Sequence, residues 1–317
     1  MDYVRPFSKL ASRDVTIAGG KGASLGEMTG RGISVPPGFV ILTTAFEQFI
    51  DSAELHNEIE SQLAKVNHHE METIERASEH IRNLIMTAVM PEAIKKTILH
   101  DYHELDAPFV AVRSSATAED GANASWAGEL DSFLNTTKET LLENVMRCWA
   151  SLFTPRAIFY RIEKGFQSSK VSVAVVVQQM VESEVSGIAF SVHPVTEDQN
   201  QLIIEAAWGL GEAIVSGSIT PDNYVIDKRD WSIIDCYKAD QEREIVRKPA
   251  GGNEWVVVSE TKRSIQKLSD AKLIELAMLV VKIEQHYGFP CDIEWAMVKE
   301  RLYVLQCRPI TTLKEPK

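Results

Sequence analysis

The chain has 317 residues, of which 44% are hydrophobic and 25% are charged, and its formal net charge is −12. These proportions are typical of a globular protein, and the excess of acids argues against a general surface for nucleic acid or anionic lipid. Any anion that binds must therefore meet a local basic pocket. No apolar run approaches the ~20 residues that span a bilayer, and residues 1–10 lack the pattern of a signal peptide. We expect a cytoplasmic protein with no nucleic-acid or membrane partner.

In the first half of the chain, the sequence predicts a glycine-rich turn over residues 17–28 that leads into a helix ending near Gly30. Residues 33–43 predict a turn and a strand. Helical spacing of Glu, Leu, Ile and Met follows over residues 44–100, where Pro91 begins a new helix. "PFVAVRSSATAED" (108–120) predicts a strand that runs into a polar loop.

The second half predicts two helices over residues 138–164, broken at Pro155. Three apolar strands follow, and the first, "KVSVAVVVQQMV", has the near-continuous pattern of a strand buried on both faces. An amphipathic helix then begins after Ser269 and ends at Gly288. Strands and helices that mix without strict alternation indicate an α+β protein. We place the boundary between two lobes at the end of the "VQQ" strand, which gives lobes 1–178 and 179–317.

"AGGKGASLGEM", residues 18–28, is a candidate phosphate-binding turn. Clustered glycines let backbone N–H groups approach phosphate oxygens, and Lys21 adds a positive charge. The spacing matches neither GxxxxGK[ST] nor GxGxxG. This motif and the similar "GLGEAIVSG" (209–217) are each open to the alternative of a purely structural turn.

Arg113 ends the apolar run of "VAVRSSATAED". A guanidinium at the end of a buried strand needs an anion or an exposed position. It can pair with Glu119 or Asp120 inside the protein, or it can bind a ligand anion, and its position in the sequence does not separate the two.

"DIEWAMVKERLYVLQCRPI", residues 292–310, predicts a two-stranded hairpin whose apolar alternation is interrupted by polar residues. A three-residue loop at 299–301 would place Glu294 opposite Gln306 and Asp292 opposite Arg308, on one face. Opposed side chains have Cβ atoms only ~5 Å apart, so a carboxylate and an amide oxygen there can share Mg²⁺. Arg308 suits a phosphoryl group by its charge and forked donors. The alternative is a solvent-facing polar surface.

The histidine and cysteine patterns indicate structural roles. His193 precedes a proline and His286 lies in the last turn of a helix, whereas His68 and His69 lie in a charged stretch that faces water. No CxxC pair occurs, which predicts reduced thiols rather than a zinc site or disulfide framework. The four cysteines are Cys148, Cys236, Cys291 and Cys307. Trp126 is unusual in a loop of small residues.

Eight motifs in order carry a resemblance to a known family: "GGKGASLGEM", "VPPGF", "AVRSSATAED", "SWAGELDSFLN", "CWASLFTPRAIFYR", "QQMV", "GLGEAIVSG" with "PDNYV", and "DIEW…LQCRPIT". Together they resemble the nucleotide-binding domain shared by phosphoenolpyruvate synthase, pyruvate phosphate dikinase and rifampin phosphotransferase. The resemblance covers essentially the whole chain. It implies an ATP-grasp fold, in which two α+β lobes hold ATP in the cleft between them.

The resemblance also implies a role for each matching residue. Lys21 and Arg113 would contact the phosphates, and Gly128 and Ser132 would cover them. Adenine and ribose would be met by the segment that links the lobes, made of Gln179, Met180, Val181 and Glu182. Mg²⁺ would be held by Glu294 and Gln306, and Arg308 would stabilise the transferring phosphoryl group. The catalytic set is therefore Lys21, Arg113 and Arg308, and the cofactors are ATP and Mg²⁺.

Two departures from the family stand out. The loop has Trp126 and Glu129 where the family commonly has Phe and Gln, and an extra carboxylate beside a polyphosphate is unfavourable. Family members also carry a swivelling domain, whose histidine accepts the β-phosphoryl of ATP, and an acceptor domain. None of the eight histidines lies in such a motif. We therefore expect these domains as partners in cis or in trans, and the final acceptor is not identified.

The expected function is the ATP-binding part of a dikinase-type phosphotransferase that cleaves ATP to AMP and phosphate, for onward transfer to pyruvate, rifampin or a similar acceptor. One alternative is an ATP-grasp ligase, which forms an acyl phosphate and releases ADP. Another is a non-catalytic ATP-binding module, which would need no transfer arginine.

Overall fold

The computed structural model describes residues 2–117, 120–121, 124–125, 130–165, 172–249 and 251–313. Trp126, Gly128 and Glu129, which the sequence analysis singled out, lie outside these residues. The chain forms two compact units: the first comprises Met1–Gly30 and Pro37–Met180, and the second comprises Arg31–Pro36 and Val181–Lys317. Helices and antiparallel sheets occur in both, which confirms the α+β class.

The first unit is built on a five-stranded sheet in which all neighbouring strands are antiparallel. In spatial order the strands are β1 (Val4–Pro6), β2 (Gly38–Ile41), β7 (Val173–Gln179), β3 (Val110–Ala116) and β6 (Ser132–Thr136). A two-stranded ribbon of β4 (Asp120–Gly121) and β5 (Ala124–Ser125) is separate. The predicted strand at 170–181 is β7, and its residues are buried through Gln178.

The α-helices of the first unit are α1 (Val15–Gly30), α2 (Thr43–Ser52), α3 (His56–Ala64), α4 (Met71–Thr87), α5 (Glu92–Leu105), α6 (Lys138–Ser151) and α7 (Pro155–Glu163). The predicted break at Pro155 is confirmed, because Thr154 caps α7 by accepting a hydrogen bond from the N–H of Ala157 at 3.2 Å. Pro91 likewise precedes α5.

Helices cover both faces of this sheet, which explains why β7 is buried although it is antiparallel. Successive residues of a strand point to opposite faces. The Ser114 hydroxyl lies 2.9 Å from that of Ser151 on α6, whereas Ser115 contacts α1 through the carbonyl of Ala18. Helices α6 and α1 therefore pack on opposite faces of β3.

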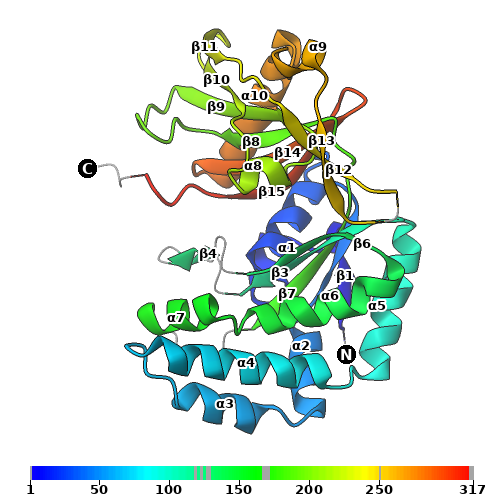
Figure 1. Cartoon of the computed structure of the whole chain (residues 1–317). Coiled ribbons are helices and arrows are strands. Elements are labelled where there is room, and N and C mark those ends of the chain that lie inside the picture. The colour runs from blue at the N-terminus through cyan, green and yellow to red at the C-terminus, as the bar shows by residue number, and fades with distance from the viewer. Residues whose placement is uncertain are drawn as a thin grey trace. The chain divides into compact units, whose positions relative to one another are not determined.

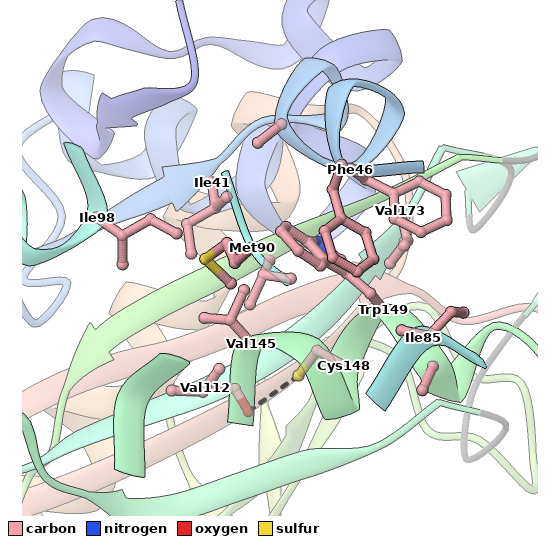
Figure 2. Close-up of a cluster of buried hydrophobic side chains, with 14 of the residues drawn as sticks. Ile41, Phe46, Ile85, Met90, Ile98, Val112, Val145, Cys148, Trp149 and Val173 are labelled. Atoms are coloured by element: carbon pink, nitrogen blue, oxygen red, sulfur yellow. Dashed lines mark hydrogen bonds between the residues drawn. The ribbon is translucent and has the colours of Figure 1, made fainter. Parts of the chain in front are cut away.

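The main core lies on the α6 face (Figure 2). Trp149 is fully buried there, and its ring lies 4.9 Å from that of Phe49 and 6.0 Å from that of Phe46. The Cys148 thiol lies against the backbone carbonyl of Val112, as the dashed line in Figure 2 shows. Burial raises the pKa of the Cys148 thiol to about 12. This thiol stays protonated and serves packing rather than chemistry.

The second unit contains a six-stranded antiparallel sheet. In spatial order its strands are β11 (Ile233–Tyr237), β10 (Asp222–Asp227), β9 (Gln201–Trp208), β8 (Val185–Phe190), β14 (Cys291–Val298) and β15 (Arg301–Pro309). A separate hairpin pairs β12 (Arg243–Arg247) with β13 (Asn253–Val257). The strands from β10 to β13 were not predicted from the sequence, although Tyr224 and Ile226 of β10 are buried in alternation.

Helix α10 (Asp270–Tyr287) covers one face of this sheet (Figure 1), and the other helices, α8 (Glu212–Val215) and α9 (Glu260–Arg263), are short. The predicted ends of α10 are confirmed: Ser269 caps it by accepting from the N–H of Lys272, and Gly288 follows it with a φ of 73°. Glu284 of α10 accepts a hydrogen bond from Ser191, which neighbours Cys291 in the sheet. Cys291 therefore faces α10, and Asp292 faces the opposite side.

Within the described residues, no helix combines the length and the apolar character needed to cross a bilayer.

Candidate functional site

The predicted glycine-rich turn over residues 17–28 is instead part of helix α1 (Val15–Gly30), and this helix is anchored on strand β3. Helix α1 is kinked at Gly19, whose φ is 67°. A Cβ there would lie 2.2 Å from the Ser115 hydroxyl oxygen, so only glycine fits this close approach. The Ser115 hydroxyl donates to the carbonyl of Ala18 at 3.0 Å and accepts from the N–H of Gly22 at 3.3 Å. The backbone that carries Lys21 is therefore fixed against the sheet.

Arg113 lies on the same face of the sheet as this part of α1. It is two residues before Ser115 on β3, so both side chains leave the face opposite α6. Its partner across the sheet on β6 is Ser132. The structure thus brings Arg113 and Ser132 together, and the part of α1 that carries Lys21 packs on the same face.

Gln178 is a residue of this face that the sequence did not single out. It is paired with Ala111 on β3 and with Gly38 on β2, so it shares the face of Arg113. The residue is 1% exposed, and its amide nitrogen has no hydrogen-bond partner among the described residues. Buried polar groups are nearly always paired, so such a donor marks a position that a ligand can complete. The only signal in the sequence was a glutamine inside a buried strand.

The segment that links the two units has a defined pattern of backbone hydrogen bonds. The N–H of Gln179 donates to Pro37 at 2.8 Å, and that of Met180 donates to Phe109 at 3.0 Å. Within the described residues, no hydrogen bond from the N–H groups of Val181 and Glu182 is present. The segment thus has two backbone N–H donors that no described residue accepts from.

The C-terminal hairpin differs from the prediction in its loop. Only Lys299 and Glu300 form the turn, with φ values of 47° and 61°, and Val298 pairs with Arg301. This is a two-residue turn of left-handed conformation, not the predicted three-residue loop. A two-residue turn alone would have shifted the polar pairs by one residue, but a β-bulge at Leu305 restores them. The predicted pairing of Glu294 with Gln306 is therefore confirmed, although the predicted loop is wrong.

Glu294 and Gln306 offer a carboxylate and an amide oxygen from directly opposed positions. Gln306 is 8% exposed, so its orientation is restricted. Among the described residues, no three His, Cys, Asp or Glu side chains gather as a complete metal cage. A carboxylate and an amide oxygen in opposed positions are ligands of the kind that Mg²⁺ takes, since it typically uses one or two protein oxygens and completes its shell with phosphates and water.

Asp292 holds Arg308 at the next position along the same face. The Nε and Nη2 atoms of Arg308 lie 2.8 Å and 2.7 Å from one oxygen of Asp292. Burial raises the pKa of the Asp292 carboxyl, and the charge of Glu294 raises it further, whereas Arg308 acts in the opposite direction. Asp292 thus orients the guanidinium.

The polar row continues across the sheet. Glu294 is paired with Ile188, Ile188 with Glu205, and Glu205 with Asn223, so all share one face. Burial raises the pKa of Glu205, the charge of Asp292 raises it further, and a hydrogen bond from Asn223 opposes the shift. Glu205 was not predicted as part of the site, although an acid at the centre of the apolar strand "QLIIEAAW" is a signal in the sequence.

The model of the family described as pyruvate phosphate dikinase, AMP/ATP-binding domain, matches residues 15–317. The chain is 44% identical to a probable phosphoenolpyruvate synthase of Methanocaldococcus jannaschii, over 100% of this chain and 27% of that protein. It is 39% identical to the phosphoenolpyruvate synthase of Pyrococcus furiosus, over 99% of this chain and 44% of that protein. It is 38% identical to the rifampicin phosphotransferase of Bacillus cereus, over 98% of this chain and 36% of that protein.

The chain thus spans less than half the length of each of these relatives. Among solved structures, a D-alanine–D-alanine ligase from Helicobacter pylori is similar with 12% identity and a TM-score of 0.29, over 68% of this chain and 48% of that one. A likeness this distant carries no argument about the chain. The family match, in contrast, extends over nearly all of it. The chain therefore belongs to the pyruvate phosphate dikinase AMP/ATP-binding domain family.

Proposed function

We propose that the chain is the ATP-grasp nucleotide-binding part of a dikinase-type phosphotransferase. It binds Mg-ATP and transfers the β-phosphoryl group to a histidine on a separate swivel domain. Both the α–β and the β–γ phosphoanhydride bonds are broken, so one water molecule is consumed and AMP and phosphate are released. The phosphoryl group then passes to pyruvate, rifampin or a similar acceptor held by a further domain. The greater length of the relatives supports partner domains in cis, and we expect the protein to work in the cytoplasm.

The observation that carries the proposal is the polar face of the β14–β15 hairpin. A plain structural ribbon has no need of two acids, an amide and an arginine in opposed pairs. Glu294 and Gln306 would hold Mg²⁺, which when bound neutralises charge on the phosphate oxygens. Arg308 would stabilise the negative charge of the phosphoryl group during transfer. Asp292 fixes the orientation of that guanidinium through the two contacts with Nε and Nη2.

The remaining residues would position the nucleotide. Lys21 and Arg113 would contact the phosphates, with Ser132 and Gly128 covering them. Gln179, Met180 and Val181 would line the adenine, with Glu182 at the ribose. Phosphoryl transfer depends mostly on positioning and electrostatic stabilisation, so this set needs no general base of its own.

Nucleotide products test the proposal. The chain would be incubated with Mg-ATP, with and without a histidine-bearing swivel domain taken from a relative. AMP that forms only when that domain is present supports the proposal. ADP would support a ligase, and bound but uncleaved ATP would support a non-catalytic module.

Arg308→Ala should bind ATP with nearly unchanged affinity and lose AMP formation by at least about a hundred-fold. Arg301→Ala is the matched control, since Arg301 is exposed at the far end of the same strand and lies over the Tyr303 ring. Equal losses of ATP binding and transfer in Arg308→Ala would contradict the assigned role.

A further inference from the structure

Glu182 forms an ion pair with Arg247 of strand β12. The Nε of Arg247 donates to the Oε1 oxygen of Glu182 at 2.6 Å, and Nη2 contacts the same oxygen. The side chain of Arg247 is 20% exposed, whereas that of Glu182 is 61% exposed. No described residue donates a hydrogen bond to the other oxygen of Glu182, Oε2. The arginine therefore orients the carboxylate and leaves one acceptor oxygen toward solvent.

This geometry suits a ligand with adjacent hydroxyl groups. An ionised carboxylate only accepts hydrogen bonds, and a hydroxyl bond to a charged acceptor is stronger than a neutral one. Because Oε1 is held by Arg247, Oε2 is presented in a fixed direction at little cost in side-chain entropy on binding. A ribose offers two neighbouring hydroxyl donors, and acidic side chains recognise ribose in this way in other nucleotide sites.

The "GLGEAIVSG" motif explains how Arg247 is held in place. The N–H of Leu210 donates to the carbonyl of Ile245 on β12 at 2.9 Å. Gly209 has a φ of 85°, and a Cβ there would lie 2.5 Å from that same carbonyl oxygen. The amide of Asn253, which pairs with Arg247 across the β12–β13 hairpin, donates to Glu212. The motif thus braces β12, which carries Arg247.

We propose that Arg247 is a positioning residue for the ribose: it sets the carboxylate of Glu182, and the Gly209–Glu212 motif sets Arg247. This inference rests on the proposed function, because it takes the ribose of ATP as the ligand. The inference adds that the preference for ribose over deoxyribose depends on Arg247, a residue that does not itself contact the nucleotide. The motif then serves sugar recognition indirectly instead of binding phosphate.

Binding of three nucleotides tests the proposal. Dissociation constants would be measured calorimetrically with Mg²⁺ for ATP, 2′-deoxy-ATP and 3′-deoxy-ATP. The wild-type chain should prefer ATP by about ten-fold over at least one deoxy form, as the loss of one charged hydrogen bond predicts. Arg247→Gln should weaken ATP binding by about ten-fold and leave that deoxy nucleotide nearly unchanged. The preference for the hydroxyl is then lost.

Variants separate this role from a merely structural one. Arg247→Gln combined with Glu182→Gln should bind ATP no more weakly than either single variant, because both remove the same contact. Arg243→Gln is the matched control: it removes a cation of the same strand that lies over the Trp255 ring. It should keep the full preference for ATP. Gly209→Ala, which displaces β12, should lose part of the preference.

Each contrary result has a distinct meaning. Weakening of all three nucleotides to the same extent by Arg247→Gln would overturn the inference and leave the proposed function intact. So would a wild-type chain that binds ATP and both deoxy forms equally. A wild-type chain that binds none of the three would instead contradict the proposed function itself.

Discussion

Substitution of Lys267 by methionine should destabilise the sheet of the second unit severely. The Nζ of Lys267 lies 2.8 Å from Asp222, and both side chains are 0% exposed. Asp222 also accepts from the N–H of Ala239 at 2.8 Å, from the N–H of Lys267 at 3.0 Å, and from the hydroxyl of Tyr224 at 2.6 Å. The change to methionine leaves a buried carboxylate without its counter-charge.

The expected loss is large because the carboxylate cannot reach water. Removal of one partner of a buried, hydrogen-bonded ion pair costs about 3–5 kcal/mol. Lys267 also donates to the carbonyl of Ala239 at 2.6 Å, which would lose that bond. Asp222→Asn combined with Lys267→Met should cost less than the sum of the single changes, because the unpaired charge is absent from the double variant.

Amide hydrogen exchange of β10 measures the loss of stability within the second unit. A local measurement is needed because a chain of two compact units need not unfold in one step. A loss of about 3–5 kcal/mol accelerates exchange of the slowest β10 amides by roughly 10²- to 10⁴-fold. Lys238→Met is the matched control, since Lys238 is exposed and lies beside Ala239. An acceleration of less than about five-fold in Lys267→Met, or an equal one in Lys238→Met, would refute the reasoning.

Three further predictions concern the site. Glu294→Gln should weaken nucleotide binding by at least about ten-fold in the presence of Mg²⁺ and leave it unchanged in EDTA. If magnesium titrations of nucleotide binding gave the same result for the variant and the wild-type chain, Glu294 would not be a magnesium ligand. Gly19→Ala should destabilise the first unit by about 2 kcal/mol or more in urea unfolding, because its Cβ would meet Ser115. Gly30→Ala is the control, since a Cβ at Gly30 meets nothing within 4 Å. Equal stability of the two variants would refute the predicted clash. Burial raises the pKa of Glu205 above its ordinary value of 4.5, so the folded state resists its ionisation. Stability should therefore fall as pH rises from 4.5 through the raised pKa, and Glu205→Gln should remove part of that fall in urea unfolding measured at pH 4 to 7. An identical pH dependence of the two proteins would count against the assignment.

Local sequence signals predicted the elements whose ends depend on a single residue. Ser269 and Gly288 bound α10 because capping needs a hydroxyl at one end and a left-handed residue at the other. Pro155 separates two helices for an equally local reason. The hairpin was harder, because its register depends on both the turn and the bulge at Leu305. No sequence rule marked that bulge, and the pairing of Glu294 with Gln306 was predicted correctly from a loop of the wrong length.

The parts of the site that sequence analysis missed depend on contacts between distant segments. Glu182 was predicted at the ribose, but its partner Arg247 lies 65 residues further along the chain, in a hairpin that was not predicted. Glu205 joins the polar row only through the order of strands in the sheet. Gln178 is notable only because its surroundings leave its amide without a partner among the described residues. Such features follow from tertiary pairing, which periodicity along the chain does not encode.

The most direct test of the proposed function follows each phosphorus atom of ATP. The chain would be incubated with Mg²⁺, a histidine-bearing swivel domain from a relative, and ATP labelled at either the β- or the γ-phosphorus. The proposal predicts label on the swivel domain from β-labelled ATP only, with the γ-label released as phosphate. Transfer of the γ-label to that domain, or ADP as the nucleotide product, would contradict it.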